Sequence, residues 1–499
     1  MRRNRKDLHL EKLKGGLDRS DCEKIDAFFD EVTENIELPI LSKSLLIDHF
    51  IKGFEFYLEK GRSVEEVCEI LDVKNLGSFY MGNNRKNYSL DNAAIIYPLG
   101  MKYGQMPMFR LSAELKEEVE PVLLQLALDF TIKRFPCFSA VIKNGFFWHY
   151  LESVNSVYLV EEEKDIPCKP ISIILRSYRS FRVLYYKKRV SVEFFHVLTD
   201  GSGGMTFLKT LIGEYLRLNG KQIPYEEGVL DINEDVKDGE LANEFKNAKG
   251  DASLSTFVDK KSLQIDGRIM KSHISRIVHN EMDASKLNET AKSYGGTVTA
   301  YITALLFLAA KRCISKKEGI FNIQIPVNMR KFNGSNTLRN YSMYFNASED
   351  IADIGDKRQL VQDIDAQIKR KGSEEMMNQM MKTTGKLISS LSYVPLFLKV
   401  PVMQNIYGYL GNSIIGLTLS NLGRVKLPET MKDEISKLYF VMPPGKPNRA
   451  TSTLATVNDI CIFSFMRNSN DPSMENILLQ LLEEDGLEVF VEGSIEYES

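Results

Sequence analysis

The segment from His196 to Gly201 holds the residue types best suited to acid–base chemistry. Histidine has an ordinary pKa of about 6.5, so much of it is neutral at pH 7 and able to accept a proton. A base placed beside an alcohol takes up its proton during attack on a carbonyl, which raises the rate by roughly 10²- to 10⁴-fold. His196 is one of six histidines, and it alone is followed by a short Asp-Gly turn. A histidine on an apolar face is also often a core residue, so spacing alone leaves both roles open.

Asp200 has two roles open to it. It could orient the imidazole of His196, or it could hold the turn by pairing with an arginine elsewhere in the chain. Gly201, Gly203 and Gly204 follow it, and we expect them to allow a tight turn because glycine lacks a Cβ atom. The segment lacks the spacing of a dinucleotide-binding or P-loop motif, so we do not predict a nucleotide loop.

Two strands must position the histidine, over 181–186 and 190–196. Side chains alternate along a strand, so His196 ends the second strand on a mainly apolar face that it shares with Val190, Val192 and Phe194. A helix with an apolar side follows the glycines. Before these strands, the periodicity predicts a helix over 121–134 and a hairpin over 139–150.

The 499 residues are enough for two or three domains. Residues 1–78 resemble a small helical module of unknown role, with helices over 21–36 and 42–60 and a third opened by the capping box of Ser63 and Glu66. The Gly- and Asn-rich residues 77–89 suggest a linker. We divide the remainder into an N-terminal lobe (79–225), an acidic crossover segment (226–264) and a C-terminal lobe (265–499).

The C-terminal lobe should mix helices and strands. Asp283 is placed to cap a helix that ends at Gly295, and Thr297 opens a buried helix that runs to Arg312. Strands are predicted over 320–327, 414–419 and 489–495. Together with the N-terminal lobe, these elements indicate an α/β fold.

Composition excludes several classes of function. The net charge of -3 and the lack of an Arg-rich stripe argue against a nucleic-acid partner. Six cysteines stand singly, without a CxxC pair, which argues against a zinc ribbon or a disulfide framework and favours a reducing cytoplasm. The chain has no HExxH motif or clustered ligand set, so we predict no metal. It also has no GxSxG elbow, which argues against an α/β-hydrolase.

Membrane and targeting segments are not predicted. The basic N-terminus lacks a following apolar run, so we expect no signal peptide and a cytoplasmic protein. The most apolar stretch, 299–310, is about a dozen residues, too short to span a bilayer. Residues 391–419 are apolar but interrupted by prolines and polar residues. We interpret them as core helices, with contact to a membrane surface as the minor alternative.

The stretch FFHVLTDGSGGMTFLKTLIGEYL, around His196, resembles the HxxxDG segment of the chloramphenicol acetyltransferase-like superfamily. It is most similar to the bacterial alcohol acetyltransferase branch, which is related to condensation domains. Further similar segments follow in the expected order over about four-fifths of the chain. They are LDNAAIIYPLG, KRFPCFSAVIKNGFFWHYLE, FRVLYYKKRVSVEFFH, GGTVTAYITALLFLA, IPVNMRKFNGSNTLRNYS and LSNLG.

The resemblance implies a two-lobed α/β sandwich with a central tunnel. It implies that His196 is the general base, and that an acyl group, by default acetyl, moves from a coenzyme A thioester to an alcohol or amine without an acyl-enzyme. The motif aspartate of the family mostly pairs with an arginine, so Asp200 and Arg330 would be architectural, as would Gly201. Coenzyme A would be a co-substrate, and no permanently bound cofactor is implied.

Several other residues could touch substrate. Ser420, Asn421 and Gly423 in LSNLG could supply oxyanion donors, or could only shape a turn. Asn340 and Asn328 could bond substrate or satisfy buried backbone groups. The basic side chains Lys331, Arg339 and Arg424 could meet coenzyme A phosphates, although such residues are usually solvated.

Alternatives to the acyl-CoA assignment remain. Condensation domains carry a histidine just before the catalytic one, where this chain has Phe195, so a condensation-type enzyme with a carrier-protein thioester is the weaker choice. A non-catalytic binding protein on the same fold is the other alternative. The helices of residues 1–78 suggest a protein partner.

Overall fold

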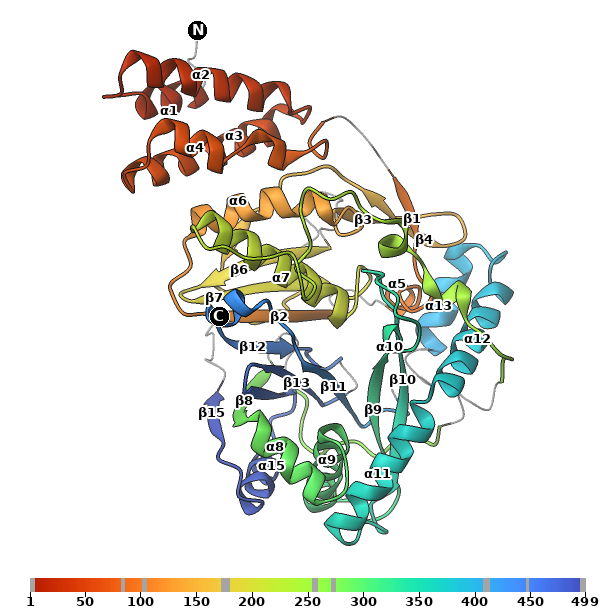
Figure 1. The fold of residues 1–499 in the computed structure, drawn as a ribbon. Coiled ribbons are helices and arrows are strands. Elements are labelled where there is room, and N and C mark those ends of the chain that lie inside the picture. Colours follow the sequence, from red (N-terminus) through yellow and green to blue (C-terminus); the bar gives the residue numbers. More distant parts are fainter. Residues whose placement is uncertain are drawn as a thin grey trace.

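The computed structural model describes residues 5–81, 86–100, 106–171, 180–253, 259–270, 275–406, 413–445 and 448–493 (Figure 1). Within these ranges the strands form three sheets, one small and two large. The small sheet has the order β1-β4-β3 and contains the predicted hairpin. Its strands are β1 (Asn87–Ser89), β3 (Ala140–Asn144) and β4 (His149–Ser153).

A five-stranded sheet forms the core of the N-terminal lobe, in the order β12-β2-β7-β6-β5. Its strands are β2 (Met108–Leu115), β5 (Val160–Glu162), β6 (Phe181–Tyr186), β7 (Arg189–Phe195) and β12 (Ile435–Val441). The bounds of β6 and β7 confirm the two predicted strands. Helix α7 (Gly201–Leu218) packs against β2 and β7, and α6 (Pro121–Thr131), extended by η2 (Ile132–Arg134), packs against α7. Strand β12 reaches this sheet from the C-terminal third of the chain, so the two lobes interlock.

The C-terminal lobe is built on a seven-stranded sheet in the order β10-β9-β11-β13-β14-β8-β15. Its strands are β8 (Arg276–Asp283), β9 (Ile320–Asn328), β10 (Ser342–Asp350), β11 (Leu417–Arg424), β13 (Ala450–Val457), β14 (Ile460–Arg467) and β15 (Phe490–Gly493). The mostly buried α9 (Val298–Cys313) contacts β9 and is flanked by α8 (Ala284–Ser293), α11 (Lys357–Lys371) and α15 (Ser473–Glu484) (Figure 1). The predicted caps are present, because Asp283 accepts from Lys286 N and Thr297 accepts from Ala300 N.

The remaining elements connect these layers. In the lobes they are α5 (Ile96–Gly100), η3 (Asp238–Leu241), η4 (Glu244–Asn247), α10 (Arg330–Asn333), α12 (Glu374–Ser390), α13 (Leu396–Ile406) and α14 (Glu429–Lys432). In its described part, the crossover segment is anchored to the N-terminal lobe by an ion pair. Glu240 is buried and pairs with buried Arg134, with 2.8 Å between Oε1 and Nη2.

The N-terminal helices share a core with the lobe that follows them. They are α1 (Arg5–Leu13), α2 (Arg19–Glu34), α3 (Ile40–Glu59) and α4 (Val64–Ile70), followed by η1 (Val73–Leu76), and the predicted capping box of Ser63 and Glu66 is present. Helix α3 packs against α6: the buried His49 Nδ1 lies 2.7 Å from Asp129 Oδ2, and the rings of Phe50 and Phe130 are 6.0 Å apart.

The linker interpretation of residues 77–89 is wrong for the part that the structure describes. Tyr80 is fully buried and its hydroxyl donates to the carbonyl of Asp129 at 3.2 Å. Residues 87–89 form β1, and 82–85 lie outside the described residues. The glycines and asparagines indicate a turn in the chain. They do not reveal that the residues beside the turn are buried or form a strand.

No single helix in the described ranges is long and apolar enough to cross a membrane. The bent pair α8 and α9 reaches the required length and composition only when taken together. Most side chains of α9 are buried inside the C-terminal lobe, which is the ordinary reason for an apolar helix in a globular core.

Candidate active site

His196 lies directly after β7, where the N-terminal lobe meets the C-terminal lobe. Its backbone N–H donates to the carbonyl of Pro107 at 2.9 Å, which holds the end of the strand. The imidazole centroid is 4.9 Å from the ring of Tyr97 and 5.0 Å from the ring of Phe109. Burial lowers the pKa of His196 below its ordinary value, and the charge of Asp200 opposes this shift only in part. Burial therefore favours the neutral form of the ring.

Asn340, from the loop before β10, determines which ring nitrogen of His196 carries the proton. The Asn340 amide nitrogen donates to the backbone carbonyls of His196 (3.0 Å) and Val197 (3.3 Å), which can only accept. Its Oδ1 must therefore be the atom that lies 3.1 Å from His196 Nδ1. A carbonyl oxygen can only accept, so Nδ1 carries the hydrogen and Nε2 keeps a lone pair. This tautomer is the one in which Nε2 can act as a base.

Asp200 holds the start of α7 rather than the imidazole. Its Oδ1 accepts from the backbone N–H groups of Ser202 and Gly203, both at 3.1 Å, which makes it the N-cap of the helix. Its Oδ2 accepts from Arg330 Nη1 and from Tyr341 N, both at 2.8 Å. Burial alone would raise the pKa of Asp200, but the Arg330 guanidinium and these hydrogen bonds hold it below its ordinary value.

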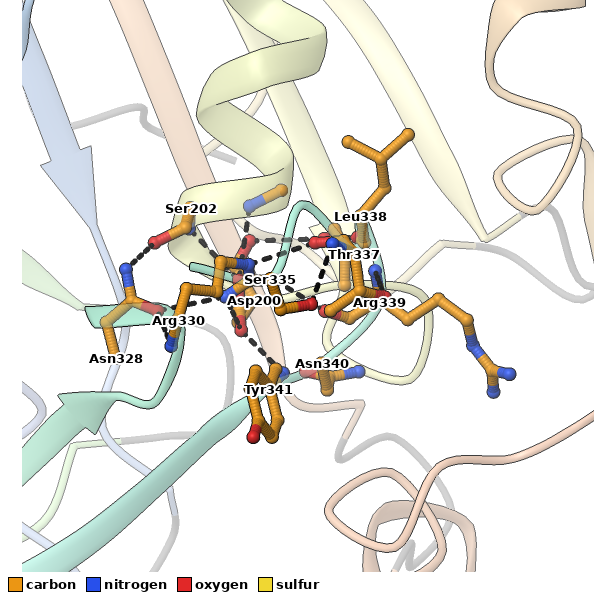
Figure 2. Close-up of polar contacts among 12 residues, drawn as sticks. Asp200, Ser202, Asn328, Arg330, Ser335, Thr337, Leu338, Arg339, Asn340 and Tyr341 are labelled. Atoms are coloured by element: carbon orange, nitrogen blue, oxygen red, sulfur yellow. Dashed lines mark hydrogen bonds and ion pairs between the residues drawn. The ribbon is translucent and has the colours of Figure 1, made fainter. Parts of the chain in front are cut away.

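Arg330 joins the N-terminus of α7 to the loop that carries Asn340 (Figure 2). Besides Asp200, its guanidinium donates to the carbonyls of Thr337 (2.9 Å) and Arg339 (2.6 Å). The ion pair implied by the resemblance is thus present between the two lobes. A buried pair with satisfied hydrogen bonds fixes geometry more than it adds stability. Through this pair the loop that carries Asn340 is held close to the end of β7.

The glycines after Asp200 differ from the expectation of a tight turn. Gly201, Gly203 and Gly204 lie in the first turn of α7, and none has a positive φ. What they need is space. A Cβ atom on Gly203 would lie 2.2 Å from Thr199 Oγ1 and 2.3 Å from the carbonyl oxygen of Leu338, and one on Gly201 would lie 2.8 Å from Leu422 Cδ2. Gly201 and Gly203 thus allow the C-terminal lobe to approach the helix, and Gly204 allows close packing on Phe109 and Phe194.

The segment that contains Ser420, Asn421 and Gly423 ends β11 beside this helix, because Leu422 faces Gly201. Asn421 donates to Thr299 Oγ1 at 3.0 Å and accepts from Gly423 N at 2.7 Å. Gly423 has a φ of +69°, at a register shift in the pairing of β11 with β13. These contacts give Asn421 and Gly423 a role in shaping the strand end. Ser420 is half-buried on the same strand.

The other polar candidates divide into buried and exposed residues. Asn328 donates to Ser202 Oγ at 2.9 Å and accepts from Arg330, so it belongs to the network of Figure 2. Arg339 is buried and bonds the carbonyl of Ser89, so its interpretation as a solvated or phosphate-binding side chain is wrong. Lys331 and Arg424 are exposed.

Asp91 and Tyr97 also lie near His196 and Asn340, and the sequence analysis named neither of them. Asp91 is fully buried, caps the turn at Ala94 and lies 3.4 Å from the Asn340 amide nitrogen. Burial raises the pKa of Asp91 to about 6, although the nearby Arg339 opposes this shift. Both residues stand in LDNAAIIYPLG, a segment noticed for its resemblance alone. The acidic side chain of Asp91 in an otherwise apolar segment is the one signal that could have singled it out.

Comparisons with known proteins identify the fold. No model of a protein family matches the sequence, and no curated protein matches it. Solved structures do match. Polyketide synthase associated protein 5 from Mycobacterium tuberculosis is 10% identical with a TM-score of 0.56, over 79% of this chain and 97% of its own. A trichothecene 15-O-acetyltransferase from Fusarium sporotrichioides is 11% identical with a TM-score of 0.52, over 81% and 96%.

Two further structures are similar to the same extent. The starter condensation domain of rhizomide synthetase, solved with C8-CoA and Leu-SNAC, is 11% identical with a TM-score of 0.53, over 80% of this chain and 94% of its own. A Fusarium sporotrichioides protein solved with coenzyme A and T-2 is 11% identical with a TM-score of 0.56, over 81% and 99%. The chain therefore has the chloramphenicol acetyltransferase-like fold, as its resemblance implied.

Proposed function

We propose that this protein is an acyltransferase that moves an acyl group from a coenzyme A thioester to an alcohol or amine, with His196 as the general base. The observation that carries the proposal is the contact between His196 Nδ1 and Asn340 Oδ1, because it leaves Nε2 unprotonated. Burial favours the neutral ring. A histidine held neutral and in one tautomer, with one nitrogen left to accept a proton, has the features that general-base catalysis requires.

The reaction needs two proton movements. Nε2 of His196 takes the proton of the acceptor O–H or N–H while the acceptor atom attacks the thioester carbonyl carbon. The C–O or C–N bond forms, and the carbonyl electron pair moves to oxygen as an oxyanion. The tetrahedral intermediate then collapses, the C–S bond breaks, and the imidazolium returns its proton to the leaving thiolate. The products are the acylated acceptor and a free thiol, with no acyl-enzyme.

An oxyanion needs preorganised donors, and Ser420 is our first choice for this role. It lies on β11, the strand whose end faces the start of α7. Asn421 and Gly423 bond each other in the structure, so we assign them to holding the strand end that carries Ser420. Asn340 and Asp200 are positioning residues, since their bonds go to His196 and to the backbone around it.

Coenzyme A is the donor we propose because similar folds have been solved with it, including the Fusarium protein that holds coenzyme A and T-2. A carrier-protein thioester is the alternative, since condensation domains share the fold. Phe195 favours coenzyme A as the donor, because condensation domains carry a histidine at this position. Here the position holds a phenylalanine that is fully buried in β7. A non-catalytic binding protein is the remaining alternative.

The experiment is a thiol-release assay with the purified full chain, acetyl-CoA and a panel of alcohols and amines. Acceptor-dependent release of free coenzyme A supports the proposal. Release only from a carrier-bound thioester would support the condensation-type alternative. Binding of an acceptor without release from either donor would support the binding protein.

A further inference from the structure

Helix α13 has the reverse of the usual arrangement of charged and apolar side chains. Its one charged residue, Lys399, is buried, and the ammonium lies 3.1 Å from the centroid of the Trp148 ring. No hydrogen-bond partner for it occurs among the described residues. Phe397 and Val402, by contrast, are 71% and 57% exposed. Positions 397, 398, 401 and 402 share one helix face, so α13 exposes a row of apolar side chains to solvent.

Neighbouring segments extend this apolar face. The turn between β3 and β4 presents Phe146 and Phe147, and it is tied to α13 because Leu396 N donates to the carbonyl of Phe146 at 2.8 Å. Tyr393, just before α13, is 88% exposed. We call the set the apolar patch; its members are Phe146, Phe147, Leu387, Tyr393, Phe397, Leu398 and Val402. It holds seven of the 15 large apolar side chains that are exposed in the described ranges.

The chain segments that carry the apolar patch are poor in acidic residues, and Glu152 on the hairpin strand β4 is paired with Lys143 at 3.6 Å. Residues 376–428 contain no Asp or Glu, although the whole chain has 67 in 499 residues. The turn segment 139–148 has none either. Lys382 and Lys386 lie on α12, which leads to the patch. Exposed apolar and aromatic side chains can enter the headgroup region of a membrane, and nearby lysines favour anionic lipids.

We propose that the apolar patch docks this protein onto the surface of an anionic membrane, with α13 lying in the interface plane. The chain is then peripheral, in agreement with the lack of a spanning helix in the described ranges. Figure 1 shows α12 and α13 at the edge of the molecule, and α13 packs against α5, whose Tyr97 ring lies 4.9 Å from the imidazole of His196. Docking brings the α5 side of the candidate site to the membrane. It does not depend on the proposed chemistry.

The test uses the full chain and its single tryptophan, Trp148, which lies beside the patch. The protein is mixed with vesicles of equal parts phosphatidylcholine and phosphatidylglycerol, or of phosphatidylcholine alone. Binding is measured by cosedimentation and by the emission of Trp148. The variant is Phe397→Ser with Leu398→Ser and Val402→Ser. The matched control is Ile40→Ser with Leu41→Ser, two apolar side chains on α3 that are even more exposed.

We expect the wild type and the control to bind the anionic vesicles, with a blue shift of Trp148 emission. The triple variant should bind at least about tenfold more weakly and should unfold at the wild-type temperature, since its altered side chains face solvent. A wild type that stays in the supernatant would overturn the proposal. So would a triple variant that binds as the wild type does, or equal binding to both kinds of vesicle. A lipid-independent dimer that the triple variant abolishes would show that the patch binds a second copy instead.

Discussion

The Nδ1 atom of His196 lies 3.1 Å from Oδ1 of Asn340, and the two residues stand 144 positions apart in the chain. The first comes from the end of β7 and the second from the loop before β10. Neither lobe alone can therefore set the tautomer of the imidazole. The base that we propose exists only when the two lobes are assembled.

This contact predicts a pH profile. Burial lowers the pKa of His196, and the reaction needs the neutral ring, so the acidic limb of kcat/KM should lie below pH 6.5. Asn340→Asp would place a carboxylate at Nδ1, which stabilises the imidazolium and raises the pKa. We predict that the acidic limb moves to higher pH and that kcat falls. A lower kcat with an unmoved limb would mean that Asn340 acts on the fold and not on His196.

The ion pair of Asp200 and Arg330 gives a prediction about stability. Asp200→Asn leaves the Arg330 charge partly buried without its partner, which should cost roughly 3 kcal/mol. Activity should fall in parallel, because the same residues hold the Asn340 loop. Combined with Arg330→Met, the loss in unfolding free energy should be smaller than the sum of the single losses. An Asp200→Asn protein of full stability without activity would assign Asp200 to catalysis.

The same pair has a pH signature. The folded-state pKa of Asp200 is lowered, so its contribution to stability is present above the unfolded value of about 3.9 and is lost as the pH falls through the folded value. The difference in unfolding free energy between wild type and Asp200→Asn should therefore shrink below about pH 4. Urea titrations at several pH values measure it, and a constant difference would contradict the assignment.

Gly203 gives a prediction about packing. An added Cβ atom would lie 2.3 Å from the carbonyl oxygen of Leu338, and a backbone atom cannot move aside cheaply. We predict that Gly203→Ala lowers both the melting temperature and the activity. Gly355→Ala is the control, since its Cβ atom would meet nothing closer than 4.0 Å. If the two variants have equal melting temperatures and equal activities, close approach of Leu338 to Gly203 is not required.

Phe50 tests whether the N-terminal helices belong to the same core as the lobe. It is fully buried against Phe28 and Phe130, so Phe50→Ala should cost roughly 3–5 kcal/mol. The whole protein should still unfold in one shifted transition. Phe490→Ala, at an exposed side chain, should leave it unchanged. A separate early transition would restore the independent module of residues 1–78.

Local patterns predicted the elements well and their partners poorly. Alternation of apolar residues located β7 and the position of His196 at its end, and cap residues located α8 and α9. The contact with Asn340 could not be read from the sequence, because it joins residues of different lobes. The resemblance supplied Arg330, yet no pattern supplied Asp91. The spacing of the glycines predicted a tight turn. Gly203 is needed instead because Leu338 of the other lobe lies against it, which no local pattern shows.

The apolar stretch 391–419 shows the same limit. Its composition predicted core helices, and α13 does bury Lys399 and Leu396. The residues that α13 exposes are as apolar as those it buries, so periodicity could not tell the two faces apart. Residues 407–412 lie outside the described ranges.

The most direct test of the central proposal is the rate of acceptor-dependent thiol release by His196→Ala, measured beside the wild type and His9→Ala. Loss of the base should lower the rate by roughly 10²- to 10⁴-fold, with the circular dichroism spectrum and melting temperature retained. His9 lies on α1, half-buried beside Asp48, and His9→Ala should keep the wild-type rate. A folded His196→Ala protein with the full wild-type rate would contradict the account.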